Sequence, residues 1–342
     1  MKDALGTIPA HRNNRLADRS PDESAIDRHK KITLQPPIDR RLVTAIDEPF
    51  FGARSIVNRP QMISVIVSTF NQPQWLTKAL WGYAFQTHTD FEIIVADDGS
   101  DDATIDAIES VRNHTDLRIQ HVWHPDEGFR KCEILNQAIL RASGDYLLFS
   151  DGDCVPRNTF VANHYHYASR DTFLSGGDFK LPIPISQSLT VDDIATCRAF
   201  QWSYLRSQGL RWSRRHLRFV AGPYFAGVLN RCTTTKPTFN GGNSSGWKDD
   251  ILAVNGFDER MRYGGLDREL GERLENAGVR GKHIRYNTVV LHLSNHDIYG
   301  TDADWENNFD IRQTVQDERR TWTDYGIQKT IGESIEQLRR AA

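Results

Sequence analysis

The sequence predicts an α/β protein with a mostly parallel central sheet and helices on both faces of that sheet. Short apolar segments alternate with segments of helical spacing from residue 63 to residue 151. The short segments are almost continuously apolar, which is typical of strands buried on both faces. Acidic residues follow two of these strands, at the carboxyl ends where parallel sheets bind their ligands.

The first elements form two strand–helix pairs. The β-branched stretch 63–70 predicts a strand, and Pro73 favours a helix start for the segment 73–86. The apolar stretch 91–100 predicts a second strand, which a helix over 101–111 follows.

The next elements complete the alternation. Strands are expected over 117–124 and 145–151, with a helix over 132–143 between them. Beyond Pro156 the sequence predicts a mixed region, with a strand and turn at 175–182, loops around helices at 239–281, and a strand that enters a polar loop at 287–296.

Composition excludes several classes of protein. The chain of 342 residues has 42 Lys and Arg against 45 Asp and Glu, so it lacks the basic excess of a general nucleic-acid binder. Its four cysteines form no CxxC pair, which disfavours a thiolate zinc site or a disulfide framework. The sequence shows no apolar run of about 20 residues and no signal-peptide core. We therefore expect a cytoplasmic protein.

Two carboxylates, Asp151 and Asp153, close the strand expected over 145–151. Two such charges about 4 Å apart repel by roughly 4 kcal/mol at an effective dielectric of about 20, so they persist together if they share a proton or hold a cation. Carboxylate oxygens suit Mg²⁺ or Mn²⁺. The alternative is a turn in which aspartates cap backbone amides.

A second acidic group, residues 97–100 (Asp-Asp-Gly-Ser), closes the strand expected over 91–100. A carboxylate there can accept a hydrogen bond from a ribose hydroxyl or a base N–H, or it can cap the next helix, and we expect both roles. The chain has no GxGxxG after its first strand and no GxxxxGK[ST], so the usual dinucleotide and P-loop sites are not favoured.

Several linked motifs resemble the family 2 glycosyltransferases of the GT-A fold: "ISVIVSTFNQ", "FEIIVADDGSDDAT", "DEGFRKCEILNQAI" and "YLLFSDGDCVP". The later stretch "GFDERMRYGGLDRELGERLENAGV", followed by "VVLHLSNH", is similar to a motif of β-1,4-galactosyltransferases and bacterial chondroitin-type polymerases. The resemblance covers about residues 62–300 and implies a Rossmann-like GT-A sheet with a mixed acceptor-side region.

The resemblance implies a nucleotide-sugar site that is spread over the strand ends. The loop after the first strand would lie against the base, the second acid of "DDGS" would contact uracil or ribose, the "GFRK" segment would face the uridine or phosphates, and the first acid of DxD would contact ribose or metal. The residues at these positions are Thr69, Phe70, Asn71, Asp98, Arg130, Lys131 and Asp151.

The resemblance also implies a Mn²⁺ or Mg²⁺ cofactor. Asp153 matches the metal-ligating last acid of DxD, with Asp151 beside it. His292, in "VLHL", matches a metal ligand of the galactosyltransferase-like members, and His296 is the competing candidate.

Asp267 matches the family's catalytic base, and relatives commonly carry Glu where this chain has Leu266. The alternative for Asp267 is compensation of the helix dipole. The residues that fall where relatives line the acceptor cleft are Gly242, Asn243, Trp247, Tyr263 and Glu269. For the tryptophan, packing is the competing explanation.

These residues imply an inverting, metal-dependent transfer of a hexose or N-acetylhexosamine from a UDP-sugar to a glycan or glycolipid acceptor. The resemblance suggests bacterial surface polysaccharide synthesis, with attachment to the inner face of the cell membrane left open. The alternatives are a catalytically impaired nucleotide-sugar- or glycan-binding protein, a sugar nucleotidylyltransferase and a polyprenyl-phosphate sugar transferase. A nucleotidylyltransferase would need a glycine-rich basic loop after the first strand, which "STFNQPQW" does not provide.

The expected organisation has five segments. They are a disordered or loosely attached arm (1–30), an N-terminal strap (31–61), a nucleotide-sugar-binding half (62–156), an acceptor-binding and catalytic half (157–300) and a C-terminal helical tail (301–342).

Overall fold

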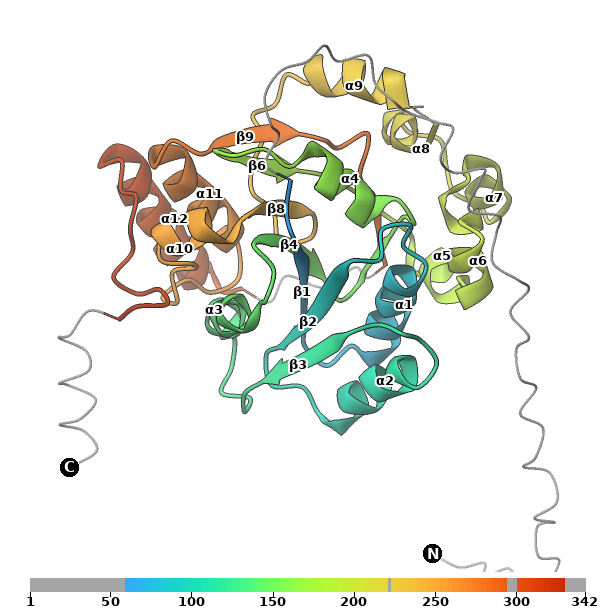
Figure 1. Cartoon of the computed structure of the whole chain (residues 1–342), viewed down its shortest axis with the longest axis horizontal. Coiled ribbons are helices and arrows are strands. Elements are labelled where there is room, and N and C mark those ends of the chain that lie inside the picture. Colours follow the sequence, from blue (N-terminus) through green and yellow to red (C-terminus); the bar gives the residue numbers. More distant parts are fainter. Residues whose placement is uncertain (1–58, 221–222, 294–299, 330–342) are drawn as a thin grey trace, which may run out of the picture. The chain divides into compact units, whose positions relative to one another are not determined.

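The structure, a computed structural model, describes residues 59–220, 223–293 and 300–329 (Figure 1). All of them belong to one compact unit within residues 56–342. The predicted arm, nearly all of the strap and the end of the predicted tail lie outside the described residues. The boundaries of the five predicted segments stay predictions.

Seven strands form the main sheet, in the spatial order β3-β2-β1-β4-β8-β6-β9. They are β1 (Ile63–Thr69), β2 (Phe91–Asp97), β3 (Ile119–Trp123), β4 (Tyr146–Asp151), β6 (Thr172–Ser175), β8 (Ser244–Trp247) and β9 (Arg280–His283). The pairs β1–β2, β1–β4, β2–β3 and β6–β9 are parallel, and β8 runs antiparallel to both β4 and β6. The predicted fold class is thus confirmed.

Helices cover both faces of this sheet, because successive strand residues point to opposite sides. Ile66 of β1 packs into a core with helices α3 (Lys131–Arg141) and α11 (Leu266–Asn276). Val65 and Val67 pack into a second core with α1 (Pro73–Ala84), α2 (Asp102–Arg112) and α4 (Phe160–Tyr167). Since β1, β2 and β4 contribute to both cores, their residues are almost continuously apolar.

A second sheet has three strands in the order β5-β10-β7, and its strand β5 follows β4 closely in the sequence. Its strands are β5 (Cys154–Pro156), β7 (Gly177–Lys180) and β10 (Val289–His292). The register of β5 and β10 sets His292 opposite Cys154. This pairing carries the predicted "VLHL" strand to Asp151, the last residue of β4, and to Asp153, which follows it.

The region after β7 is built from short helices rather than from long regular elements (Figure 1). They are α5 (Ile183–Ser188), α6 (Val191–Ala195), η2 (Arg198–Phe200), α7 (Trp202–Ser207), η3 (Arg214–His216), α8 (Leu217–Val220), α9 (Pro223–Arg231) and α10 (Lys248–Ala253). In the predicted C-terminal tail, α12 (Asp302–Asp317) is a helix that contacts α11.

Replacing Gly99 by Ala should destabilise the fold, because Gly99 has φ +94° and an added Cβ would stand 2.6 Å from the Asp126 backbone. The control is Gly278→Ala, at φ +96° with open space around the added methyl group. Both variants pay the left-handed penalty of about 1–2 kcal/mol. Urea denaturation should show a clearly larger loss for Gly99→Ala, and equal losses would contradict the contact between these two loops.

Candidate active site

The parallel register brings three polar strand ends to one edge of the sheet. Thr69 of β1 lies opposite Asp97 of β2, and Ser68 lies opposite Asp151 of β4. Asp151 accepts hydrogen bonds at Oδ1 from Ser68 Oγ and Lys131 Nζ, each at 2.8 Å. Lys131 is the first residue of α3, so this ion pair ties the start of that helix to the end of β4.

Asp153 and His292 form the second contact of the site. His292 Nε2 lies 2.9 Å from Asp153 Oδ2, and the Leu293 amide donates to the Asp153 carbonyl at 2.9 Å. Burial would lower the pKa of His292, but the hydrogen bond and the charge of Asp153 raise it above the ordinary value. His292 therefore lies beside the last acid of the DxD, and the charges of both Asp153 and Asp151 act on it.

Asp267 enters the same region from the first turn of α11. Gly264 and Gly265, with φ of +101° and +80°, turn the chain immediately before this helix. Burial raises the pKa of Asp267; Lys131 opposes this shift, and Asp151 adds to it. Its Oδ1 is buried without a hydrogen-bond partner among the described residues. A carboxylate with an unsatisfied buried oxygen is ready to accept a proton or a ligand hydroxyl.

Lys131 carries the positive charge that faces these acids. Burial alone would lower its pKa, but Asp151, Asp267 and Asp153 together raise it well above the ordinary lysine value. Lys131 is therefore charged at neutral pH. Of the two predicted alternatives, Lys131 lies in the acidic cluster, whereas the Arg130 guanidinium bonds Pro125 O and pairs with Glu127 and Glu133.

A cavity of about 320 Å³ unites these groups. Among the predicted residues its lining includes Asp151, Gly242, Asp267 and His292. Sequence reasoning missed most of the wall, which comes from β5, the β6–β7 region, the loop before β8 and two arginines. The missed lining residues are Cys154, Ser175, Gly176, Gly177, Asp178, Arg218, Thr238, Asn240, Gly241 and Arg285.

Asp98, predicted to contact uracil or ribose, is held by partners within the chain. His124 Nε2 lies 2.8 Å from its Oδ1, and the Arg130 backbone amide donates to its Oδ2 at 3.1 Å. Burial raises the pKa of Asp98, although the hydrogen bonds from His124 and Arg130 oppose the shift. The motif "WHPDEGFRK" thus contributes an imidazole that sequence reasoning did not assign.

The loop after β1 keeps an exposed aromatic ring beside these acids. Asn71 joins this loop to the next one, because its backbone amide donates to Ser100 Oγ and its Oδ1 accepts from the Asp101 amide. Phe70 is 45% exposed, whereas Thr69 is buried with no partner for its hydroxyl among the described residues. An exposed ring at a strand's carboxyl end suits stacking with a planar base.

The structure contradicts the predicted acceptor contacts of three side chains. Trp247 is 1% exposed in the core, where its indole donates to Ser169 O. Asn243 is fully buried, and its amide donates to Gly177 O. Asn243 directly precedes β8 and Trp247 is its last residue; this central strand lies in a segment that was predicted as loops around helices.

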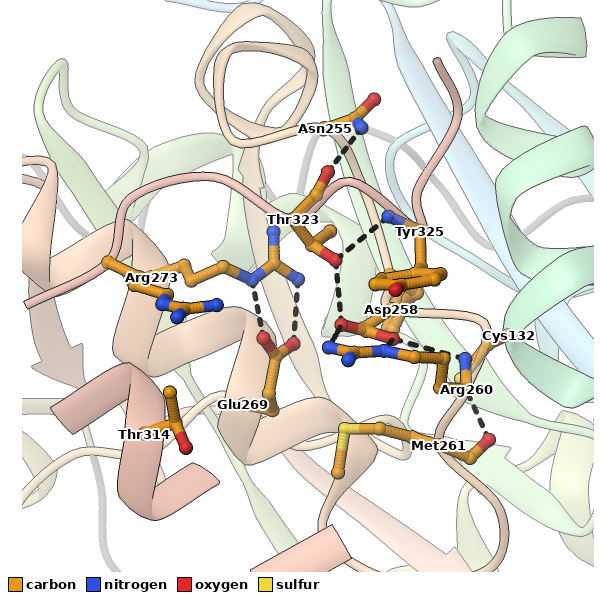
Figure 2. A network of polar contacts seen from close by, with 12 residues as sticks. Cys132, Asn255, Asp258, Arg260, Met261, Glu269, Arg273, Thr314, Thr323 and Tyr325 are labelled. Carbon is orange, nitrogen blue, oxygen red and sulfur yellow. Dashed lines mark hydrogen bonds and ion pairs between the residues drawn. The ribbon is translucent and has the colours of Figure 1, made fainter. Parts of the chain in front are cut away.

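Glu269 is the third correction, since its side chain is fully buried and both of its oxygens pair with Arg273 (Figure 2). Arg273 also donates to the carbonyls of Val254 and Gly256. The pair therefore anchors α11 to the loop after α10. Leu266 is buried in the same core, so its position is an apolar anchor for the first turn of α11.

Tyr263 lies between two aromatic rings rather than alone in a cleft. Its ring packs edge-on against Phe129 and Trp305, with centroids 6.1 and 6.0 Å away. His296, the competing metal-ligand candidate, lies outside the described residues. No helix in the described ranges has the length and apolar character to cross a membrane.

Comparisons with known families agree with this geometry. Residues 64–226 match the family model of glycosyl transferase family 2. The chain belongs to glycosyltransferase family 2. Residues 225–296 match the model described as the N-terminal domain of galactosyltransferase. The predicted GT-A family and its galactosyltransferase-like C-terminal motif are therefore confirmed.

Two proteins with different names are similar to this family 2 chain in sequence. A validoxylamine A glucosyltransferase of Streptomyces hygroscopicus subsp. limoneus is 32% identical over 68% of the chain and 51% of its own length. The chondroitin synthase of Escherichia coli is 25% identical over 79% of the chain and 41% of its own length. The chain thus spans about half the length, or less, of these relatives.

Similar solved structures include Staphylococcus aureus TarS, at 16% identity and a TM-score of 0.49 over 74% of the chain and 39% of TarS. A mannosyltransferase from Pyrobaculum calidifontis, in complex with GDP-Man and Mn²⁺, is 18% identical with a TM-score of 0.47. That match covers 75% of the chain and 62% of the mannosyltransferase.

Replacing Arg273 by Met should reduce the free energy of unfolding by about 3–5 kcal/mol, because it leaves the Glu269 carboxylate buried without its partner. The matched control is Arg312→Met. Arg312 pairs with Glu272, which lies on α11 like Glu269, and the side chains of this pair are 24% and 16% exposed. That change should cost about 0–1 kcal/mol. Similar losses in urea titrations of both variants would contradict the structural role given to Glu269.

Proposed function

We propose that this chain is an inverting, metal-dependent glycosyltransferase that moves a sugar from a UDP-sugar to a glycan or glycolipid acceptor. One observation carries the proposal: Asp151, Asp267 and His292 line a single cavity, with Lys131 and Asp153 in contact with them, in a chain of glycosyltransferase family 2. A hexose or N-acetylhexosamine donor and a role in surface polysaccharide synthesis are the finer parts of the proposal.

The donor set around Asp153 fits a hard divalent cation. Ligand atoms of Asp151, Asp153 and Cys154 all lie within 4.8 Å of one another. Burial and the nearby aspartates raise the pKa of the Cys154 thiol well above its ordinary value, and a soft sulfur is in any case a poor ligand for a hard cation. The remaining donors, two carboxylates and the His292 imidazole, suit Mn²⁺ or Mg²⁺.

Each residue then has a distinct task. A cation held by Asp153, His292 and Asp151 would act as a Lewis acid toward the diphosphate of a bound donor. Lys131 places a second positive charge beside the same leaving group. Asp267 accepts the proton of the acceptor hydroxyl as that oxygen bonds to the anomeric carbon and the bond from this carbon to the diphosphate oxygen breaks, which releases UDP.

An inverting outcome is supported by the partners of the carboxylates around Lys131. Asp151 is already paired with Lys131, whereas Oδ1 of Asp267 has no partner among the described residues. A single general base without a protein nucleophile supports direct displacement, which inverts the anomeric centre. The exposed Phe70 ring supports a nucleotide on the β1–β2 side of this edge.

The first test is UDP release from a panel of UDP-sugars by the full chain, with Mn²⁺ and with EDTA. Metal-dependent release, increased by a glycan acceptor, is the expected result. Asp153→Asn should abolish the metal-dependent part, because the variant loses the charge that holds the cation. UDP binding without release from any donor would favour the impaired binding protein, and unchanged activity of Asp153→Asn would discard the metal assignment.

Asp267→Asn should lower transfer by about 10²- to 10⁴-fold, the usual contribution of a general base, while UDP binding is retained. The control is Asp249→Asn, which removes an exposed acid from the first turn of α10 and should leave the rate unchanged. Transfer measured by mass spectrometry at wild-type rates in Asp267→Asn would remove Asp267 from this role.

The same variant should be more stable than the wild type at about pH 7 but not at about pH 3. Because burial raises the folded-state pKa of Asp267, the carboxyl favours folding below its unfolded pKa, and that contribution is lost as the pH rises through the folded pKa. Thermal unfolding at both pH values measures the effect, and a gain confined to acid pH would contradict it.

A further inference from the structure

The charged residues in and beside the cavity of the candidate site fall into two contact groups, which we call its two walls. On one wall Asp151 and Asp267 accompany Lys131 and His292, with Asp153 behind them. The other wall carries two arginines, Arg218 of α8 and Arg285 of the turn between β9 and β10, with a single acid, Asp178. The acidic wall suits a cation, and the second wall has an excess of positive charge.

Among the residues that the structure describes, Arg285 has no ion-pair partner that would explain its place in this wall. Its side chain is half-buried, and its Nε is buried without a hydrogen-bond partner in the described part of the chain. A guanidinium is always charged, so its partial burial is costly unless an anion or an acceptor compensates it. An unpartnered donor at a cavity wall therefore favours the binding of an anionic ligand, because the ligand supplies the acceptor that the guanidinium lacks.

Arg218 adds a second guanidinium to the same wall. Its side chain is 16% exposed; it donates to the Asp178 carbonyl and lies 3.9 Å from the Asp178 carboxylate. Burial lowers the pKa of Arg218; Asp178 opposes this shift, and the charges of Arg285 and Arg215 lower it further. The two cavity arginines thus repel each other, and one acid at this distance compensates them only in part.

We propose that Arg218 and Arg285 form an anion subsite that binds a carboxylate or phosphate group carried by the sugar substrate. The inference rests on the proposed glycosyltransferase function and specifies its substrate class. Guanidinium groups bind both anions through paired hydrogen bonds, so the shared chemistry is a planar fork facing two oxygens. The donor diphosphate is served by the opposite wall, where Lys131 and the metal ligands lie.

The test compares wild-type protein with Arg285→Gln and Arg285→Lys by calorimetry in the presence of Mn²⁺. The donor arm uses UDP, UDP-glucose and UDP-glucuronic acid. The acceptor arm uses glucose, glucuronate and glucose 6-phosphate added to the UDP complex. The control is Arg280→Gln, which removes an exposed arginine of β9 that does not line the cavity.

In either the donor arm or the acceptor arm, Arg285→Gln should weaken binding of the anionic ligand by about 10- to 100-fold, which is the usual contribution of a charge-assisted hydrogen bond. Binding of UDP and of the neutral ligand should stay unchanged. Arg285→Lys should recover part of the loss, because the charge remains and the fork is gone. The arm that responds tells whether the anion belongs to the donor sugar or to the acceptor.

Three results would overturn the subsite. Equal weakening of UDP and all UDP-sugars would assign the arginines to the diphosphate, and no difference between charged and neutral ligands would leave them without a ligand. A similar loss of anion binding in Arg280→Gln would show a general charge effect. Failure of the wild type to bind UDP at all would instead overturn the proposed function itself, and the subsite with it.

Discussion

The ion pair between Lys131 and Asp151 is the contact on which the site depends. Three aspartates approach one another where β4, the following turn and α11 meet, and at an effective dielectric of about 20 two charges about 4 Å apart repel by roughly 4 kcal/mol. Lys131 compensates them from the first residue of α3, so the start of that helix is fixed by the charge it faces. Without this lysine, the acids would have to take up protons or move apart.

The same charge distribution explains why composition says little about the substrate. The net charge of the chain is only −3, yet the cavity separates an acidic wall from a basic one. A metal-bound diphosphate matches the first wall, and an anionic sugar substituent matches the second. The chain spans about half the length of its relatives, or less, and each match covers only part of the chain. The local charges of the cavity are therefore a better guide to the substrate than the names of the relatives.

The sequence predicts the elements of residues 63–151 well, because β1, β2 and β4 each contribute to two cores and are therefore almost continuously apolar. The carboxyl-edge acids follow from that topology. The prediction from sequence fails at β8. This strand, Ser244–Trp247, is short and rich in small residues, yet it lies between β4 and β6 in the main sheet. Asn243, directly before this strand, and Trp247, its last residue, were therefore predicted in a cleft, whereas both lie in the core.

Two further features depend on contacts that local patterns do not carry. Glu269 and Arg273 are spaced like an ordinary surface pair, and only the packing of α11 against the loop after α10 shows that they are buried. Arg218 and Arg285 are far apart in the chain and meet only through the cavity wall. Long-range tertiary packing decides both cases.

The most direct test of the account is a crystal grown with UDP and Mn²⁺, with anomalous scattering used to locate the metal. We expect a manganese ion bound by the Asp153 carboxylate and His292 Nε2, at about 2.0–2.4 Å, with the diphosphate beside Lys131. A manganese ion or a UDP molecule on another face of the protein, out of contact with Asp151, Asp153 and Asp267, would contradict the central claim.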